Sequence, residues 1–252
     1  METYFNIRYE FDHFKVHTAI STRIQQPGSD YICVADGVIV DNVNRNEYYR
    51  KIVNGGMFAI CDSSYVPLYL KWLYGIKRKQ YSGSDIFKDI ISQGTYRMIF
   101  MGTSDKILSA LRKNLIKVNP KVADMKFIEL PFRKVDEFDY PTIAKNIHED
   151  GAEIIWIALG APKQEYFMAN LKPHLNHGIM IAVGAAFKFF SGIDAKRAPK
   201  WMVKNHLEFV YRIFSEPKKQ LNRCWHIIIS LPCLLYQESK HKSNLKPTKH
   251  IF

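Results

Sequence analysis

The sequence predicts an α/β fold: a doubly wound, mostly parallel sheet followed by a C-terminal helical appendage. Short apolar runs alternate with segments of helical pattern through most of the chain. This alternation is typical of parallel βαβ units, in which a crossover helix joins successive strands. Several apolar runs end at a glycine, as strands do where they turn into the next helix. With 252 residues, of which 47% are hydrophobic, the chain can form one large core plus an appendage.

Six strands are predicted from short apolar runs. They cover residues 30–34, 57–61, 97–101, 126–130, 153–159 and 179–183. The run at 153–159 is the strongest, because its residues from Ile154 to Leu159 are all apolar and it stops at Gly160. Strands that alternate with helices in this way form parallel pairs.

Helices are predicted between the strands, at residues 85–93, 105–118, 140–149 and 164–171. Pro141 falls in the first turn of the third helix, where its missing N–H costs no helical hydrogen bond. After Gly192 the pattern changes to helices at residues 199–215 and 218–230, which are separated by Pro217 and followed by Pro232. We therefore expect an α/β domain over residues 1–195 and a basic amphipathic appendage with a tail over residues 196–252.

The positive charge is concentrated in the predicted appendage. Of the net charge of +12, the segment from Arg197 to the C-terminus carries +8, with eleven Lys/Arg residues and three acidic ones. Such a segment suits nucleic acid, an anionic membrane or a phosphorylated ligand. A solvated helix face with a basic tail is the alternative that charge alone leaves open.

Several functional classes are excluded or disfavoured by missing patterns. The four cysteines lie far apart without a CxxC pair, so we expect buried free thiols rather than a zinc site or a disulfide framework. No Gly-x-Gly-x-x-Gly follows a predicted strand, which argues against a dinucleotide-dependent enzyme. The histidines show no metal-ligand spacing, and we expect no metal and no cofactor. A nucleic-acid binder is supported by charge alone.

A candidate ligand site follows the strongest strand. Gly160 ends the strand, Pro162 follows, and the polar residues Lys163, Gln164 and Glu165 open the next helix. Ligands of open α/β sheets bind at such turns, where backbone N–H groups and the helix N-terminus favour phosphate. We therefore expect a nucleotide-type or phosphorylated ligand.

Six motifs occur in order along the chain. They are Gly83-Ser84-Asp85, Met101-Gly102, the run 160–165, the run from Gly184 to Gly192, the run 197–201, and the run 207–217. Together they resemble the WecG/TagA/CpsF glycosyltransferase family. The resemblance covers roughly residues 31–223, and its second half matches more closely than its first. It implies a Rossmann-like domain that transfers a sugar from a nucleotide sugar to a lipid-diphosphate-linked acceptor, with inversion and without a required metal.

The resemblance implies two catalytic residues. Counting back from Gly83, Asp62 falls on the aspartate that serves as the general base in the family, although Cys61 and Ser63 replace its proline and glycine neighbours. A carboxylate at the end of a strand suits that role, and an N-cap in the following turn is the alternative. Gln164 matches the glutamine that contacts substrate in the family.

The other positions carried over from the family are substrate contacts. They are Asp36, Gln80, Gly83, Asp85, Gly102, Gly160, Pro162, Lys163, Glu165 and Gly184, with the appendage residues Arg197, Arg212 and Arg223. Glycine turns let the backbone approach a diphosphate, and an arginine binds one through two parallel hydrogen bonds. For Arg212, a salt bridge to Glu208 four residues earlier is the alternative.

Besides Cys61 and Ser63, four positions depart from the family pattern. Lys188 replaces an acidic residue of the family. Val34 and Asp36 replace a threonine and an asparagine, and Gln80 replaces an arginine, although Lys77, Arg78 and Lys79 lie next to it. These departures leave the donor sugar open. They also motivate a second hypothesis, a non-catalytic subunit that binds a nucleotide sugar or a lipid-linked glycan. Asp36 is an alternative acid/base residue, which the spacing to Gly83 disfavours.

The predicted function is transfer of a hexose or an N-acetylhexosamine, similar to N-acetylmannosamine, from a UDP-sugar to a polyprenyl-diphosphate-linked sugar. The partners implied are the UDP-sugar donor, the lipid-linked acceptor and a membrane surface, with no nucleic acid. The appendage is expected to dock on the cytoplasmic face of the bacterial plasma membrane as a peripheral element. The sequence leaves a homo-oligomer open.

Overall fold

A computed structural model describes residues 1–193, 202, 211 and 217–244. In these residues an eight-stranded sheet has the order β1-β2-β4-β3-β8-β7-β5-β6, and only β1 runs antiparallel to its neighbour. The strands are β1 Glu2–Tyr4, β2 Ile7–Tyr9, β3 Asp30–Ala35, β4 Phe58–Cys61, β5 Met98–Gly102, β6 Lys126–Ile128, β7 Ile154–Ala158 and β8 Ile179–Ala182. The predicted α/β class and parallel sheet are confirmed.

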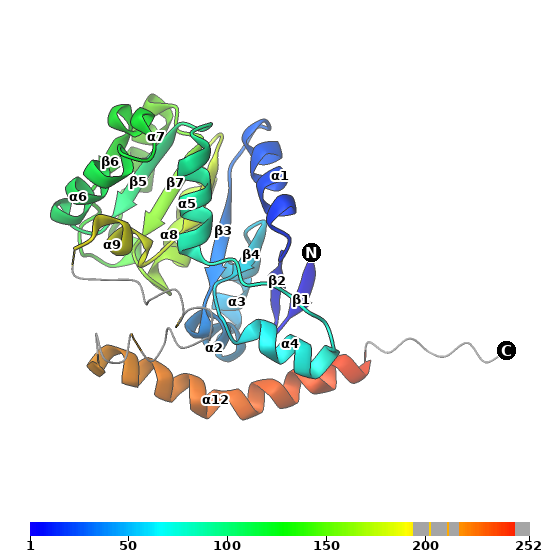
Figure 1. The fold of residues 1–252 in the computed structure, drawn as a ribbon. Coiled ribbons are helices and arrows are strands. Elements are labelled where there is room, and N and C mark those ends of the chain that lie inside the picture. Colours follow the sequence, from blue (N-terminus) through cyan, green and yellow to red (C-terminus); the bar gives the residue numbers. More distant parts are fainter. Residues whose placement is uncertain (194–201, 203–210, 212–216, 245–252) are drawn as a thin grey trace.

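Helices cover both faces of the sheet (Figure 1). One hydrophobic core forms beneath α2 Gly37–Arg45, α3 Glu47–Asn54, α4 Val66–Tyr74, α7 Tyr140–Asp150 and α8 Lys163–Leu171. The other forms beneath α1 His13–Ile24, α5 Gly83–Gln93, α6 Asp105–Leu115 and α9 Ala186–Ser191. Three short 3₁₀ helices, Pro120–Asp124, Val135–Glu137 and Lys172–His174, lie in connections. Burial of the central strands β3, β4, β8, β7 and β5 on both faces explains why these strands read as continuous apolar runs.

The hairpin β1–β2 and the helices α1 to α4 were not predicted. The hairpin turn consists of Phe5 and Asn6, both with positive φ. Glycine is the usual sequence signal for such a turn, and this turn has none. Tertiary contacts stabilise this turn instead, because the Phe5 ring is buried and the Phe5 N–H donates to Glu238 at 2.8 Å.

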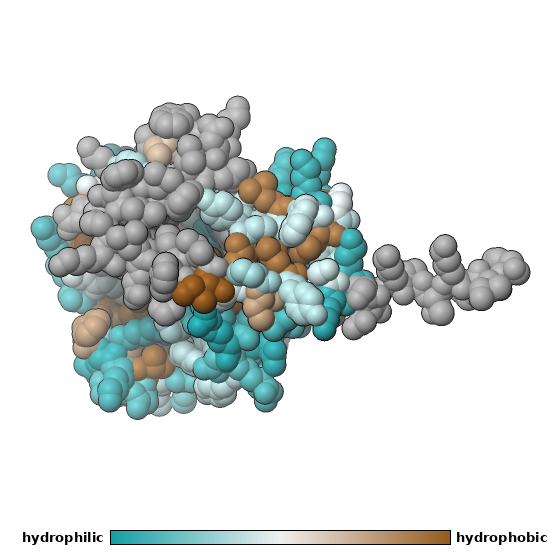
Figure 2. Space-filling model, turned by 90° about the horizontal axis from the view of Figure 1, so that it is seen from below, coloured by the Kyte–Doolittle hydropathy of each residue, from teal (hydrophilic) through white to brown (hydrophobic). Residues whose placement is uncertain are grey.

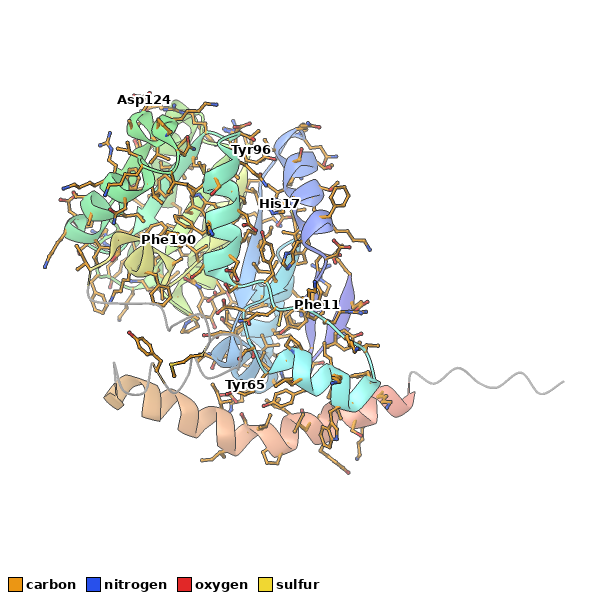
Figure 3. All side chains as sticks on the ribbon, viewed as in Figure 1. Phe11, His17, Tyr65, Tyr96, Asp124 and Phe190 are labelled. Atoms are coloured by element: carbon orange, nitrogen blue, oxygen red, sulfur yellow. The ribbon has the colours of Figure 1, made fainter. Side chains whose placement is uncertain are left out.

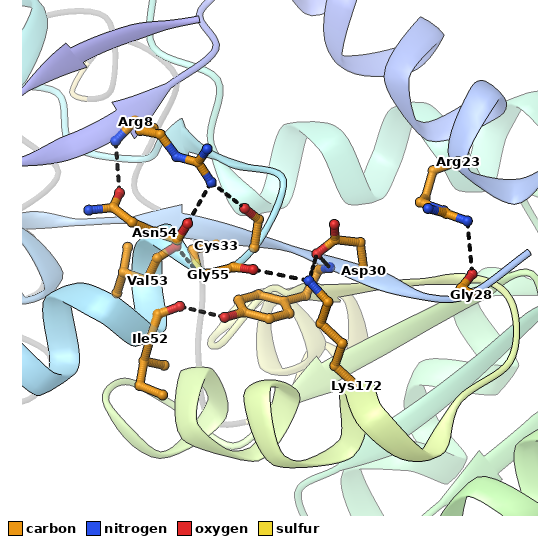
Figure 4. A network of polar contacts seen from close by, with 12 residues as sticks. Arg8, Arg23, Gly28, Asp30, Cys33, Ile52, Val53, Asn54, Gly55 and Lys172 are labelled. Atoms are coloured by element: carbon orange, nitrogen blue, oxygen red, sulfur yellow. Dashed lines mark hydrogen bonds and ion pairs between the residues drawn. The ribbon is translucent and has the colours of Figure 1, made fainter. Parts of the chain in front are cut away.

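A polar network at the amino end of β3 ties α3, α8 and the hairpin together (Figure 4). Lys172 bonds the Asp30 carboxylate at 2.8 Å and the Gly55 carbonyl at 3.0 Å. Arg8 of β2 donates to the Gly56 carbonyl at 2.7 Å. Two of the acceptors are backbone carbonyls of the residues after α3. The network therefore lies at the amino ends of the strands, opposite to the edge at which the loops after the strands meet.

The C-terminal helix α12, Pro217–Asn244, contains Pro232, so the prediction that this helix ends before that proline is wrong. Pro232 is exposed, and Figure 1 shows the helix bowed. The helix continues because its part beyond Pro232 docks on the body of the protein. Leu234 is buried in the core, and Glu238 accepts hydrogen bonds from Phe5 N–H and from the Tyr74 hydroxyl at 2.7 Å. This tertiary packing compensates for the one helical hydrogen bond that proline removes.

Cys33 and Cys61 are buried free thiols, as expected, but Cys233 is exposed on α12, which corrects the prediction for that residue. In the described part of the chain, no helix is both long enough and apolar enough to cross a bilayer. The predicted domain boundary after residue 195 falls among residues that the structure does not describe, and it stays a prediction.

Replacing Glu238 by alanine should destabilise the protein. The change leaves the buried Phe5 N–H without its acceptor, which costs about 1–3 kcal/mol, and removes the shorter of the two hydrogen bonds of the Tyr74 hydroxyl. Urea unfolding measures the loss. The exposed neighbour Gln237 provides the control, since Gln237→Ala should change stability by no more than about 0.5 kcal/mol. Equal stability of the two variants would contradict this account of how α12 is held.

Candidate active site

The loops that follow β3, β4, β7 and β8 meet at the carboxyl edge of the sheet. β3 and β8 are adjacent strands at the centre of the sheet. β4, which follows β3 in the chain, pairs with the other edge of β3, and β7, which precedes β8, pairs with the other edge of β8. Open α/β sheets bind ligands where the strand order reverses in this way. Of the fifteen site residues predicted from the sequence, the structure describes twelve in full. They lie in or next to these four loops or at the end of β5.

Asp62 follows β4 and lies directly beside the end of β3. Its backbone N–H donates to the Ala35 carbonyl at 3.0 Å, and its Oδ1 accepts from the Gly83 N–H at 2.9 Å. Gly83 is the first residue of α5, so the half-buried carboxylate faces the positive end of a helix. In the turn that leads to α4, Ser63 Oγ accepts from the Tyr65 and Val66 N–H groups, and Tyr65 is the N-cap of the helix.

Three of the departures from the family pattern have structural roles around Asp62. Asp36 caps α2, with Oδ1 accepting from Val38 N–H at 2.9 Å and Ile39 N–H at 3.0 Å, a role that asparagine also performs. Gln80 donates through Nε2 to the Asp62 carbonyl at 2.6 Å. Val34 packs beneath Gly83, where a Cβ would lie 3.1 Å from Val34 Cγ1. Gln80 therefore contacts Asp62 directly, Val34 packs against the glycine that bonds its carboxylate, and Asp36 caps the helix that follows β3.

The start of α5 is fixed by its own side chains. Ser82 is the N-cap and accepts from the Asp85 N–H, while its hydroxyl donates to the Asp85 carboxylate at 2.6 Å. Asp85 thus helps to hold the helix end against which Asp62 rests. Arg78, one of the cations near Gln80, forms an ion pair with Glu2.

Gln164 forms the second part of the site, at the start of α8. Its Oε1 accepts from the Gly160 N–H at 3.1 Å, and its Nε2 donates to Glu165 Oε1 at 2.9 Å. The other oxygen of Glu165 accepts from the Tyr49 hydroxyl at 3.0 Å. Glu165 has no exposed surface, and burial raises its pKa to about 7, against the lowering effect of the two side-chain hydrogen bonds.

Two glycines allow close approach at this edge. At Gly102, with φ of 122°, a Cβ would lie 2.6 Å from the Ala158 carbonyl oxygen, so β5 and β7 can meet there only without a side chain. At Gly184, with φ of 49°, a Cβ would lie 3.7 Å from Gln164 Oε1. Gly184 therefore borders the Gln164 amide, whereas Gly102 lies farther along the edge.

Pro162 and Lys163 face the neighbouring loop. Pro162 is exposed at the N-cap of α8, and the Ala161–Pro162 peptide is cis. The Lys163 ammonium lies over the rings of Phe132 and Phe138, 5.2 and 5.3 Å from their centroids. In this structure Lys163 is thus engaged with the loop after β6 rather than with Asp62 or Gln164.

Comparisons with known proteins show the family to which the chain belongs. The model of the Glycosyl transferase WecG/TagA/CpsF family matches residues 5–245. The chain belongs to this family. The N-acetylglucosaminyldiphosphoundecaprenol N-acetyl-beta-D-mannosaminyltransferase of Bacillus subtilis (strain 168) is 24% identical over 260 residues, which cover 98% of this chain and 95% of the relative. The enzyme of the same name from Bacillus spizizenii (strain ATCC 23059 / NRRL B-14472 / W23) is 22% identical over 231 residues, covering 90% and 86%.

The protein is therefore a WecG/TagA/CpsF glycosyltransferase, and the resemblance found in the sequence is confirmed. The roles assigned to individual residues stay predictions. Arg197 and Arg212 lie outside the described residues, and for Arg223 only the backbone, within α12, is described. Among the residues that the structure describes, no three His, Cys, Asp or Glu side chains come together as metal ligands would.

Two features of this glycosyltransferase's site were missed by sequence reasoning. Tyr49 lies on α3, a helix that was not predicted, and no motif marks it. Ile227 of α12 lies over Gly37 at the start of α2, where a Cβ would lie 3.0 Å from Ile227 Cδ1. The C-terminal helix thus contacts the loop after β3, which only long-range packing reveals.

The raised pKa of Glu165 should make stability depend on pH. The folded protein binds the proton of the Glu165 carboxyl group more tightly than the unfolded chain does. Stability should therefore fall as pH rises from the ordinary pKa of glutamate to about 7, and then level off. Glu165→Gln should remove this component. Urea unfolding of both proteins at pH 5 and pH 8 should show a difference of about 2–3 kcal/mol in their pH dependence. Parallel pH curves would contradict the assignment.

Proposed function

We propose that this glycosyltransferase transfers an N-acetylhexosamine or a hexose, similar to N-acetylmannosamine, from a UDP-sugar to a polyprenyl-diphosphate-linked sugar with inversion. The product belongs to a bacterial surface polysaccharide such as capsule, exopolysaccharide or teichoic acid. The observation that carries the proposal is that the Asp62 carboxylate and the Gln164 amide lie at one sheet edge, the first in the loop after β4 and the second at the start of α8, the helix that follows β7. The names of the two Bacillus relatives support the acceptor class.

In the proposed reaction, Asp62 accepts the proton of the acceptor hydroxyl as that oxygen attacks the anomeric carbon of the donor. The bond from this carbon to the UDP oxygen breaks, and UDP leaves on the opposite face. The Gly83 N–H bond to Oδ1 holds the carboxylate in one orientation. General-base catalysis of this kind contributes about 10²–10⁴-fold.

The anionic part of the donor fits the neighbouring backbone. A Cβ at Gly160 would meet nothing within 4 Å, one at Gly184 would meet only the Gln164 amide, and α8 begins three residues after Gly160. We infer that the diphosphate lies against these turns. The appendage arginines at positions 197, 212 and 223 remain the cations proposed to neutralise it.

The outward surfaces of α4 and α12 suit a lipid bilayer. On α4, Leu68 and Trp72 are one turn apart and exposed, Trp72 by 72%. On α12, exposed residues recur every three or four positions, at Ile229, Pro232, Cys233 and Tyr236. Figure 2, which views the molecule from the side of α12, shows apolar residues gathered beside polar ones on this face. Exposed apolar residues that include Trp and Tyr are typical of an interfacial membrane contact.

The charge around this surface favours an anionic bilayer. Residues 63–84 contain four Lys/Arg residues and no acidic residue, and residues 217–244 contain five against one. The one acid of that helix, Glu238, is buried against Tyr74. We therefore propose that the protein is peripheral on the cytoplasmic face of the plasma membrane, where this surface brings the catalytic edge to the lipid-linked acceptor.

Asp62→Asn should abolish turnover while the protein still binds donor. Purified protein in detergent is given a panel of UDP-sugars, including UDP-N-acetylmannosamine, with a short-chain polyprenyl-diphosphate-N-acetylglucosamine acceptor, and UDP release is measured. Wild type should release UDP in an acceptor-dependent way from one donor. The variant should be slower by at least about 10²-fold, with UDP-sugar affinity unchanged by calorimetry.

Asp124→Asn is the matched control. Asp124 is an exposed carboxylate at the opposite end of the molecule from Tyr65, which follows the Asp62 loop (Figure 3). It should retain wild-type turnover. Measurable donor binding by wild type without UDP release from any donor would instead support the non-catalytic binding subunit.

Removing the exposed apolar pair of α4 should weaken membrane binding. Leu68→Ser with Trp72→Ser should lower partitioning into phosphatidylglycerol-containing vesicles by at least about tenfold, because two apolar side chains no longer leave water. Vesicle sedimentation measures this. The control is Phe14→Ser, which removes an equally exposed aromatic from α1. Equal binding by all three proteins would contradict the assignment of α4 to the bilayer.

A further inference from the structure

Glu165 lies directly behind Gln164 and makes no contact with solvent. Its two carboxylate oxygens are used by two elements: Oε1 accepts from Gln164 Nε2 at 2.9 Å on α8, and Oε2 accepts from the Tyr49 hydroxyl at 3.0 Å on α3. The ring of Tyr166, the next residue on α8, packs against Tyr49 at a centroid distance of 5.4 Å. Burying a carboxylate between two neutral donors costs free energy of folding. A functional role beside the site would explain why a glutamate stands there.

This arrangement fixes the orientation of the Gln164 amide. An ionised carboxylate only accepts hydrogen bonds, so the NH₂ end of the amide faces Glu165. The carbonyl end then faces the Gly160 N–H at 3.1 Å. Among the contacts of the described residues, one Nε2–H is used by Glu165 and the second is not. The amide borders Gly184, whose Cβ position lies 4.0 Å from Nε2.

We propose that Glu165 and Tyr49 are positioning residues, which hold the Gln164 amide so that its second Nε2–H donates to an oxygen of the bound sugar nucleotide. The inference rests on the proposed function. Glu165 acts through Gln164 and does not itself touch substrate. A negative charge on Glu165 strengthens the bond from Nε2 and fixes the amide more firmly than a protonated carboxyl does.

The groups around Glu165 place the titration of its carboxyl group near neutral pH. They are Tyr31 and Cys33 of β3, Asp36 before α2, Tyr49 of α3, and Gln164 and Tyr166 of α8. Burial and Asp36 raise the pKa of Glu165, whereas the hydrogen bonds from Gln164 and Tyr49 lower it, with the result at about 7. We therefore expect transfer to increase as pH rises through 7.

The test compares pH profiles of kcat and KM for wild type, Glu165→Gln and Tyr49→Phe. The donor is the UDP-sugar from which wild type releases UDP in the panel described above, with the same acceptor. Wild type should show a limb near pH 7. Glu165→Gln, whose amide oxygen still accepts from Gln164, should lose this limb, with kcat lower by about tenfold at pH 8. Tyr49→Phe should keep the limb but move it to higher pH, because the bond that lowers the pKa of Glu165 is gone. Glu149→Gln, at an exposed glutamate of α7, should match wild type.

A second readout does not need turnover. The side-chain NH₂ signal of Gln164, identified by its loss in Gln164→Met, is followed by ¹⁵N NMR from pH 5.5 to 8.5. It should titrate near pH 7 in wild type and stay constant in Glu165→Gln. A Gln164 signal that is independent of pH in wild type, or a limb near pH 7 that persists in Glu165→Gln, would overturn the inference. Titration without any UDP release would refute the proposed function and leave the positioning pair standing.

Discussion

The parallel pairing of β4, β3, β8 and β7 is the constraint on which the site depends. Parallel strands end at one edge, so the loops that carry Asp36, Asp62, Gly160 and Gly184 meet although they are distant in sequence. Gly83 completes this edge, because its lack of a side chain lets α5 begin against Val34 and Val183. The positive end of α5 can then reach the Asp62 carboxylate.

Two buried carboxylates join parts of the chain that no local pattern connects. Glu238 links α12 to the N-terminal hairpin and to α4, and Glu165 links α8 to α3. Each has both oxygens occupied by donors, as a buried carboxylate requires. The first fixes the C-terminal helix against the body of the protein. The second fixes the amide of Gln164 at the candidate active site.

The placement of α12 relates the catalytic edge to the proposed membrane surface. The helix lies against α2 and α4, and Ile227 lies over Gly37 at the start of α2. Its inner face therefore contacts the loop after β3, while Ile229, Pro232 and Tyr236 face outward. One helix thus borders both the site and the surface proposed to meet lipid. The proposed reaction needs such proximity, since in it the sugar of the acceptor reaches Asp62 while the lipid chain stays in the bilayer.

The sequence by itself determined the central strands, the helices α5 to α8 and the family, because apolar runs of strand length and glycine turns are local signals. It also placed Asp62 at the end of a strand and Gln164 at the start of a predicted helix, where the structure has α8. Only the tertiary structure decided the Phe5–Asn6 turn, the continuation of α12 through Pro232 and the contact of Tyr49 with Glu165. In each of these, partners distant in sequence supply the stabilising contact, and such energy leaves no periodic trace along the chain.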